Sequence, residues 1–236
     1  MPSQFYDNYI QRQIDSGINN RIYSLYKRLI DVGLRKDSKI LEIGCGIGIL
    51  TYLLSKHIKS GIIEAVDFSE KSIEYAKRHI SNKNIQLTAS DILDYTSKTT
   101  FDYVLLFDAL EHIPQERHPE LFSKISHWMH LDSVLFINLP NPDYILYDQQ
   151  NNPEALQEID QPIYIDTLSH VLKGCELHIV KMETYSIWVK NDYQFYVIQK
   201  RRVFEEILLE KNWNIITKIM NRLNLKIRKI KYNYPR

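Results

Sequence analysis

Short apolar runs alternate with longer amphipathic stretches between residues 38 and 140. Five runs are nearly continuous in apolar residues and predict buried strands, at residues 38–43, 61–68, 85–91, 101–110 and 133–140. Stretches with apolar residues at helical spacing separate the first from the second, the second from the third, and the fourth from the fifth. Continuous apolar strands joined by helices are typical of a parallel sheet covered on both faces. The pattern therefore predicts a doubly wound α/β domain.

The segments on either side of this core predict further elements. Apolar residues recur at helical spacing from Tyr6 to Val32 and are interrupted at Ser16 and Gly17, which predicts two helices, the first of them short. The stretch that follows Pro140 is rich in Asn, Gln, Asp and Pro and indicates a long surface excursion that opens on a turn.

Two last apolar runs complete the expected sheet. They lie at residues 175–189 and 192–200 and flank the turn-like sequence Lys-Asn-Asp, so they predict an antiparallel hairpin. The helix before the fifth strand is expected at residues 120–131. The predicted fold class is α/β, with a doubly wound, mostly parallel sheet of seven strands, N-terminal helices, a C-terminal antiparallel hairpin and a basic C-terminal helix.

The distribution of charge separates the end of the chain from the rest. The formal net charge of the 236 residues is only +1, yet the part from Lys200 onward holds eleven Lys and Arg residues against three Glu residues. We therefore expect one domain over residues 1–200 and a basic extension over residues 201–236. Within the domain, residues 1–36 are expected to form a helical lid. Residues 140–165 are expected to form an insertion on the same side of the domain as this lid.

The extension also carries an apolar stripe at helical spacing. The stripe consists of Phe204, Ile207, Leu208, Ile215, Ile219 and Leu223. A helix of this kind is expected to pack on the protein's own sheet or on a second copy, which makes a homodimer possible. The basic end of the helix, from Lys226 to Lys231, leaves a membrane surface or nucleic acid open as partners.

Composition restricts the class of protein further. With 44% hydrophobic and 25% charged residues, the chain has the balance of a soluble globular protein. The two cysteines, Cys45 and Cys175, lie in apolar runs without CxxC spacing, which argues against a disulfide framework or a zinc site, and no metal site is expected. Neither a secretion-type apolar segment nor a membrane-length apolar run is present, so a cytoplasmic location is expected.

A glycine-rich loop follows the first predicted strand, where doubly wound sheets bind their ligands. Gly44, Gly46 and Gly48 give the pattern GxGxG, which departs from the GxGxxG of dinucleotide sites, and no Lys-Ser/Thr follows as in a P-loop. Glu42 adds a carboxylate that would repel a pyrophosphate but tolerate an amine-bearing ligand. The loop therefore suits a nucleoside without phosphates.

The run from Leu41 to Gly48 resembles motif I of the class I S-adenosylmethionine-dependent methyltransferases. Four later segments resemble the other motifs of that family in the same order, at residues 64–69, 89–95, 101–114 and 133–142. Together they cover residues 39–142. The resemblance implies a Rossmann-like methyltransferase with S-adenosyl-L-methionine as methyl donor and S-adenosyl-L-homocysteine as product.

The resemblance also implies a set of cofactor-binding residues. In it the glycines take the methionine portion, the acid after the second strand takes the ribose hydroxyls, the acid after the third meets the adenine, and the end of the fourth borders the adenosyl group. These residues are Glu42, Gly44, Cys45, Gly46, Gly48, Asp67, Phe68, Ser69, Asp91, Ile92, Phe107, Asp108 and Ala109. The alternative for Asp67 is a neighbour of a helix N-cap, and for Asp91 an exposed turn acid.

The implied reaction is an in-line transfer of the sulfonium methyl to a nucleophile, in which alignment supplies most of the rate. A general base is needed only if the acceptor must lose a proton. His112, just beyond the fourth strand, is the candidate because an imidazole titrates near neutral pH. Its alternative role is a helix-start histidine that orders the loop.

The acceptor side is expected between the N-terminal helices and the segment after the fifth strand. The candidate substrate-binding residues are Tyr6, Tyr9, Arg12, Tyr144, Tyr147 and Gln161, which would suit a polar or aromatic small molecule. The alternative is that these tyrosines only cap the core, with their hydroxyls in water. The sequence thus predicts methyl transfer to an O or N nucleophile of a metabolite, sugar or lipid precursor.

Three other functions stay open at this point. An RNA or protein methyltransferase would use the basic extension for docking. A noncatalytic cofactor-binding module would keep the fold without the reaction, and an NAD enzyme would use the same glycine loop for another nucleotide.

Overall fold

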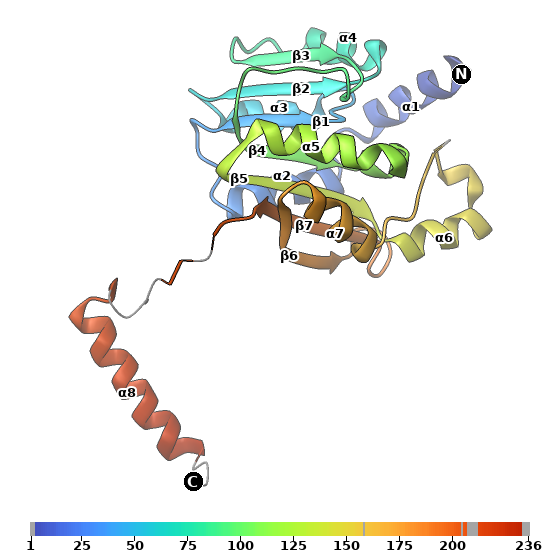
Figure 1. Ribbon diagram of the computed structural model, residues 1–236. Helices are drawn as coiled ribbons and strands as arrows, with labels where there is room; N and C mark the ends of the chain where they lie inside the picture. The colour runs from blue at the N-terminus through green and yellow to red at the C-terminus, as the bar shows by residue number, and fades with distance from the viewer. Residues whose placement is uncertain (1–2, 158, 204, 207–211, 233–236) are drawn as a thin grey trace. The chain divides into compact units, whose positions relative to one another are not determined.

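The computed structural model describes residues 3–157, 159–203, 205–206 and 212–232, with the side chains of residues 3–9 left out of that description. The chain divides into two compact units, Met1–Arg201 and Arg202–Arg236. Figure 1 shows the seven-stranded sheet of the first unit and the single long helix of the second. Each unit is described by itself.

The first unit is built on one twisted sheet with the strand order β3-β2-β1-β4-β5-β7-β6. The strands are β1 (Lys39–Ile43), β2 (Ile62–Asp67), β3 (Ile85–Ala89), β4 (Phe101–Phe107), β5 (Met129–Pro140), β6 (Leu177–Tyr185) and β7 (Tyr193–Lys200). Strands β1 to β5 are parallel, whereas β7 pairs antiparallel with both β5 and β6. The doubly wound, mostly parallel sheet with a C-terminal antiparallel hairpin is therefore confirmed.

Helices cover both faces of this sheet, as Figure 1 shows. They are α1 (Ser3–Ser16), α2 (Asn20–Asp31), α3 (Ile49–His57), α4 (Glu70–His79), α5 (His118–Trp128), α6 (Pro142–Asn151) and α7 (Ile165–Gly174). Short 3-10 turns lie at η1 (Leu110–His112), η2 (Gln115–Arg117) and η3 (Pro153–Ala155).

The alternation of side chains along the strands divides the core into two clusters. Helices α2, α3 and α4 pack on the face that includes Ile40 and Leu105, and helices α5 and α7 pack on the face that includes Leu41 and Leu106. Neighbouring residues of β1 and β4 thus serve opposite faces, as the two-residue period of a strand requires. Because both faces are covered, these strands are largely apolar.

The N-terminal helices differ from the expectation in length and in role. α1 has 14 residues and is not short, while α2 has 12. α2 begins at an N-cap, where the Asn19 side chain accepts a hydrogen bond from the Ile22 amide, and it buries Leu25 and Leu29 in the core. Helix α2 is therefore part of the core. The lid predicted for residues 1–36 stays a prediction for α1 alone.

The region after β5 is more regular than a surface excursion. The Asn141 side chain accepts a hydrogen bond from the Asp143 amide and caps α6, so the turn predicted there is wrong. Helix α7 was not predicted, although it buries Leu168 and Leu172 against α5 and the sheet. The long polar stretch before it and the apolar strand directly after it hide its short apolar period.

The boundary between α5 and β5 also differs from the sequence prediction. Residues 129–131 were expected in a helix but belong to β5, where Met129 pairs with Phe101. The Ser133 hydroxyl donates to the Phe101 carbonyl and accepts from the His130 amide, which holds the chain extended at this point. The contacts with Phe101 therefore decide the conformation of residues 129–131, against the helical spacing of the apolar residues there.

The second unit contains α8 (Ile215–Tyr232), which has no buried residue. Its N-cap is Asn214, whose side-chain oxygen accepts from the Thr217 amide at 2.8 Å. Of the predicted apolar stripe, Phe204, Ile207 and Leu208 lie outside the described residues. Among the described helices none is both long and apolar enough to span a bilayer.

Candidate functional site

The carboxyl ends of β1, β2 and β4 meet at one edge of the sheet, and the glycine loop lies there. Gly44, Gly46 and Gly48 have φ angles of +75°, +53° and +81°, in the left-handed region that favours glycine. The Gly44 and Cys45 amides donate to the Val66 carbonyl at the end of β2. The loop is therefore held against the second strand, and α3 begins directly after it.

At Gly44 and Gly46, a Cβ would meet the elements that flank the loop. A Cβ on Gly44 would lie 2.6 Å from the Cβ of Ala109, at the end of β4. A Cβ on Gly46 would lie 2.9 Å from the amide nitrogen of Gln13, on α1. The loop is thus enclosed by β4 on one side and by the N-terminal helix on the other.

Gln13 was not predicted from the sequence. Its side-chain oxygen Oε1 is buried and has no hydrogen-bond partner among the described residues. It lines a cavity of about 80 Å³ together with Glu42, Gly44 and Asp108. A buried acceptor without a partner is costly, so this oxygen is poised for a donor that enters the cavity.

Glu42 lies buried at the end of β1, on the same cavity. The Thr51 hydroxyl donates to Glu42 Oε2 at 2.7 Å. Burial raises the pKa of Glu42 to about 8, against the opposing effect of the Thr51 hydrogen bond. A cationic group placed nearby would return this carboxyl to its ionised form.

Asp67 ends β2 and organises the loop through both oxygens. Gly46 donates its amide to Asp67 Oδ2 at 2.7 Å, and Ser69 donates its amide to Oδ1 at 2.9 Å. Burial raises the pKa of Asp67, while the Ser69 and Gly46 hydrogen bonds oppose that shift. Each oxygen keeps a second lone pair, so the carboxylate can still accept from a ligand hydroxyl.

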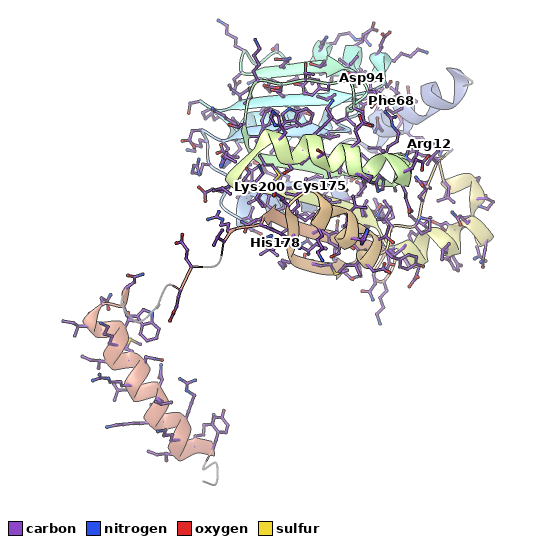
Figure 2. The ribbon with its side chains drawn as sticks, viewed as in Figure 1. Arg12, Phe68, Asp94, Cys175, His178 and Lys200 are labelled. Atoms are coloured by element: carbon purple, nitrogen blue, oxygen red, sulfur yellow. The ribbon has the colours of Figure 1, made fainter. Side chains whose placement is uncertain are left out.

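Two neighbours of Asp67 have distinct positions. The Ser69 side chain accepts from the Ser72 amide and caps α4. Phe68 is 62% exposed directly after β2, and Figure 2 shows it at the same edge as Arg12 of α1. An exposed aromatic ring at this edge is available to stack on a flat ligand.

Asp91 follows β3 and lies in a different environment from Asp67. Its Oδ1 accepts from the Leu93 amide, and its Oδ2 lies 3.2 Å from Arg117 Nη1. The pair is about two-fifths exposed, with side-chain exposures of 41% and 42%. Ile92 beside it is buried in the core. A ligand that uses the Asp91 carboxylate therefore shares it with Arg117.

The end of β4 carries an ion pair that the sequence did not reveal. Arg21, on α2, lies with Nη1 2.9 Å from Asp108 Oδ2. Asn138 of β5 donates its side-chain amide to Asp108 Oδ1 at 2.7 Å. Asp108 has a φ of +51°, which is uncommon for a residue with a side chain. Both partners thus hold a strained aspartate beside the glycine loop.

Hydrogen bonds connect the Arg21–Asp108 pair and its partner Asn138 to the β6–β7 hairpin. The Tyr185 hydroxyl donates to Asn138 Oδ1 at 2.7 Å, and Arg21 Nη1 donates to the Tyr193 hydroxyl at 3.3 Å. The Arg21 guanidinium also lies 5.8 Å from the centre of the Trp188 ring. Arg21, Asp108 and Tyr193 thus form a polar wall with aromatic rings at its sides, next to Phe107 and Ala109 at the end of β4.

The loop that presents Trp188 is fixed by one buried aspartate. Asp192 accepts from the amides of Ile187, Trp188 and Val189 at 2.8, 2.8 and 3.0 Å. The aromatic content of the hairpin is the signal that could have drawn attention to it in the sequence. The pairing with Arg21 had no such signal.

His112 lies in η1 with partners on both ring nitrogens. Its Nδ1 donates to the Ile159 carbonyl at 2.7 Å and lies 2.9 Å from Asp160 Oδ1, while Nε2 lies 2.9 Å from the side-chain amide nitrogen of Gln157. Burial lowers the pKa of His112, but the Asp160 hydrogen bond and the charge of Glu111 raise it to about 9. A charged imidazole is a donor, so this arrangement does not suit a general base at neutral pH.

Glu111, next to His112, was not predicted. Its carboxyl is 2% exposed, its Oε2 has no hydrogen-bond partner among the described residues, and burial raises its pKa to about 8. Its Oε1 lies 3.9 Å from His112 Nε2, so the two buried groups form a pair.

The predicted acceptor residues have several different positions. The side chains of Tyr6 and Tyr9 lie outside the described residues, and Arg12 is exposed on α1. Tyr144 and Tyr147 stack on α6 with ring centres 6.5 Å apart. Gln161 donates its side-chain amide to the Ile113 carbonyl at 3.0 Å and accepts from the Gln115 amide, so it anchors the insertion to the segment after β4.

The residues at this site fit an amine-bearing nucleoside better than a phosphate. Buried acceptors on Gln13, Glu42 and Asp67 surround the loop. Burial, with the charges of Glu42 and Asp67, raises the pKa of Cys45 and keeps its thiol protonated, so Cys45 is no nucleophile. Cys45 and Cys175 are both free. Within the described residues, no group of three or more His, Cys, Asp or Glu could hold a metal ion.

Comparison with known proteins finds similarity to methyltransferases over part of the chain. Residues 40–131 match the family model described as "Methyltransferase domain". The chain is 28% identical over 107 residues to (S)-coclaurine N-methyltransferase from Thalictrum flavum subsp. glaucum, a match that covers 44% of this chain and 29% of that protein. It is 34% identical over 83 residues to malonyl-[acyl-carrier protein] O-methyltransferase from Priestia megaterium, which covers 35% of this chain and 30% of that protein. The match thus spans about a third of the length of these curated relatives.

Solved structures share the fold over a longer stretch. Magnesium protoporphyrin IX methyltransferase from Synechocystis, with bound S-adenosylhomocysteine, superposes with a TM-score of 0.63 at 16% identity, over 82% of this chain and 87% of that chain. A methyltransferase from Clostridium acetobutylicum has a TM-score of 0.63 at 15% identity, over 83% of this chain and 98% of that chain. Residues 40–131 are thus similar to a methyltransferase domain, and the first unit has the fold of solved S-adenosylmethionine-dependent methyltransferases.

Proposed function

We propose that this chain binds S-adenosyl-L-methionine at the glycine loop and transfers its methyl group to an O or N nucleophile of a small molecule. The observation that carries this proposal is the pairing of an enclosed glycine loop with three buried acceptors, on Gln13, Glu42 and Asp67. The printed names of the curated relatives, which include N- and O-methyltransferases, support the same reaction class. When bound, the cofactor supplies an activated methyl on a sulfonium.

Each end of the cofactor has candidate residues on this chain. Asp67 would accept from the ribose hydroxyls, while Phe68 and the backbone at Ile92 would border the adenine, with Asp91 beside them. Gln13 and Glu42 would take the α-ammonium, because both are buried acceptors on the same small cavity. Glycines at positions 44 and 46 would let the methionine portion lie against the backbone.

The acceptor would lie on the side of the polar wall formed by Arg21, Asp108 and Tyr193. Fixed charges and hydroxyls in a poorly solvated setting can orient a polar nucleophile for in-line attack, and orientation is the main contribution such a reaction needs. Trp188 adds an exposed aromatic face next to this wall. A small molecule with both a polar group and a flat or apolar part fits these features.

Proton removal from the acceptor, where it is required, has two candidates. His112 was the expected base, but in this arrangement it is a donor to Ile159 and Asp160. Glu111 has a free buried oxygen, and its pKa of about 8 lies near the operating range of a base. Glu111 is therefore the better proton acceptor, and His112 keeps the loop over it in place.

The test is a labelling experiment with the full chain. Purified protein and methyl-labelled cofactor are incubated with cell extract that has been separated into small-molecule, lipid, nucleic-acid and protein fractions. Label in the small-molecule or lipid fraction supports the proposal. Label in nucleic acid or protein favours an RNA or protein methyltransferase instead.

A matched variant keeps this experiment interpretable. Asp67→Asn removes the carboxylate that would bind the ribose, so it should abolish transfer in every fraction. If the variant labels as well as the native protein, the transfer does not come from this site. Cofactor binding without label in any fraction would favour a noncatalytic module.

A further inference from the structure

Helix α8 combines an apolar stripe with a strongly basic remainder. Six apolar residues, each more than half exposed, recur along one side: Ile216, Ile219, Met220, Leu223, Ile227 and Ile230. At about 100° of rotation per residue they share an arc of about 100° that contains no polar residue. The helix is therefore amphipathic over its whole length.

The basic residues are placed in a specific way around this arc. Lys226 and Lys231 directly border it, one on each side, at the same rotation per residue. Lysine has a long apolar stem, so it can lie along an apolar surface and keep its ammonium in water. Lysines at both borders of an apolar arc suit a helix that lies in the plane of a membrane–water interface.

The charge of the helix points to the same kind of partner. Among its 18 residues are six Lys and Arg and no Asp or Glu. The cations are Lys218, Arg222, Lys226, Arg228, Lys229 and Lys231. An anionic bilayer surface complements this charge and offers the apolar layer that the arc requires.

Two other partners match only part of the pattern. Pairing with α8 of a second copy would bury the apolar arcs but bring two sets of six cations together without any acid on the helix. Nucleic acid would match the cations, yet phosphate contacts require no continuous apolar arc. Both stay as outcomes of the test.

We propose that α8 is an in-plane anchor that binds the surface of a bilayer containing anionic lipid. The Asn214 cap starts the helix, the apolar arc enters the headgroup boundary, and the flanking lysines meet the lipid phosphates. This inference is independent of the reaction proposed above. It gives the enzyme access to acceptors that partition into the bilayer.

The experiment measures binding of the full chain to vesicles by flotation. One set contains phosphatidylcholine with about 30% phosphatidylglycerol, and the other contains phosphatidylcholine alone. The native chain is expected to bind the anionic vesicles at least about tenfold more tightly, and added salt should weaken that binding.

Two matched double variants separate the apolar face from the polar one. Leu223→Gln with Ile227→Gln is expected to lower binding to anionic vesicles by about tenfold or more, because it removes apolar contacts without changing charge. Asn221→Gln with Asn224→Gln makes the same new side chains on the polar face and is expected to leave binding within about twofold. Lys226→Gln with Lys231→Gln should reduce binding and its salt dependence.

Three results would overturn the proposal. The first is that the native chain binds neither kind of vesicle. The second is an apolar-face variant that binds vesicles normally but loses a dimer or lowers the melting temperature of the first unit, which would assign the arc to protein packing. The third is tight, salt-sensitive binding to RNA that is unchanged in the apolar-face variant, together with weak vesicle binding.

Discussion

Arg21 Nη1 lies 2.9 Å from Asp108 Oδ2 and ties the second helix to the end of β4, immediately beside the glycine loop. Asn138 holds the other oxygen of the same carboxylate, and Tyr193 shares the same guanidinium. Four elements therefore converge on one aspartate with a left-handed backbone conformation. Strain of this kind persists only where the surroundings fix it, and here Arg21 and Asn138 hold the two carboxylate oxygens.

The Arg21–Asp108 pair is expected to contribute measurably to stability. A double-mutant cycle with Arg21→Gln and Asp108→Asn should give a coupling free energy of about 1 kcal/mol or more, because both side chains are at least three-quarters buried. Urea denaturation of the four proteins measures it.

The Arg35–Asp37 pair is the matched control for that cycle. Its side chains are 62% and 64% exposed, so no measurable coupling is expected. Equal coupling in the two cycles would show that the buried network adds nothing.

Gly44→Ala should weaken binding of S-adenosylhomocysteine by about tenfold or more and lower the unfolding free energy by about 1–3 kcal/mol. The reason is that the new Cβ would lie 2.6 Å from Ala109, in a backbone with φ of +75°. Calorimetric titration and urea denaturation measure the two effects.

Gly33→Ala separates backbone strain from the clash. Gly33 also has a left-handed backbone, with φ of +91°, but a Cβ there meets nothing within 4 Å. This variant should lose stability by about 1 kcal/mol and keep its affinity for S-adenosylhomocysteine. A similar loss of affinity in both variants would contradict the position assigned to Gly44.

Gln13→Ala is expected to reduce the affinity for S-adenosylhomocysteine by about tenfold, because it removes a buried acceptor next to Gly46. Gln11→Ala, on the same helix, should change the affinity by less than about twofold, since Gln11 only donates to Asp15 on the surface. An analogue without the α-amino group should bind the native protein and Gln13→Ala with equal affinity. A difference that persists with this analogue would sink the assignment.

The hydrogen bond between His112 and Asp160 predicts a pH-dependent stability. The pKa of His112 is raised from an ordinary value of about 6.5 to about 9, so folding favours the protonated form. Its contribution is complete below about pH 6.5 and is lost as the pH rises through 9. Over that range the native protein should lose about 2–3 kcal/mol more unfolding free energy than Asp160→Asn.

Urea denaturation at several pH values between these limits measures the effect. Asp160 also raises the pKa of Glu111, so both buried groups contribute to the difference between the two proteins, and both contributions have the same sign. A constant difference between native protein and Asp160→Asn across the range would mean that His112 is not charged in the folded state.

The sheet and the glycine loop were predictable because their determinants are local in sequence. Ile40 and Leu41 belong to one uninterrupted apolar run, and Gly44 and Gly46 follow it at fixed spacing. Helix α7 was missed because the burial of Leu168 and Leu172 depends on packing against α5, which lies far away in the sequence. The same holds for β5, whose start is fixed by contacts with Phe101.

The polar wall was not predictable for a related reason. It is made by Arg21, Asp108 and Tyr193, while Tyr144 and Tyr147 stack on each other on α6, and their role in binding the acceptor stays a prediction. Which residues form this wall depends on which strand ends lie side by side in the fold. That arrangement cannot be read from a single sequence. Glu111 shows the same limit, because only its burial distinguishes it from a surface acid.

Titration calorimetry of the purified full chain with S-adenosylhomocysteine, and in parallel with NAD, tests the central claim most directly. We expect one site per chain with a dissociation constant in the range of about 1–100 µM for S-adenosylhomocysteine, lost in Asp67→Asn, and no measurable heat with NAD. Preferential binding of NAD, or binding of S-adenosylhomocysteine that Asp67→Asn leaves unchanged, would contradict the assignment of the glycine loop to the methyl donor.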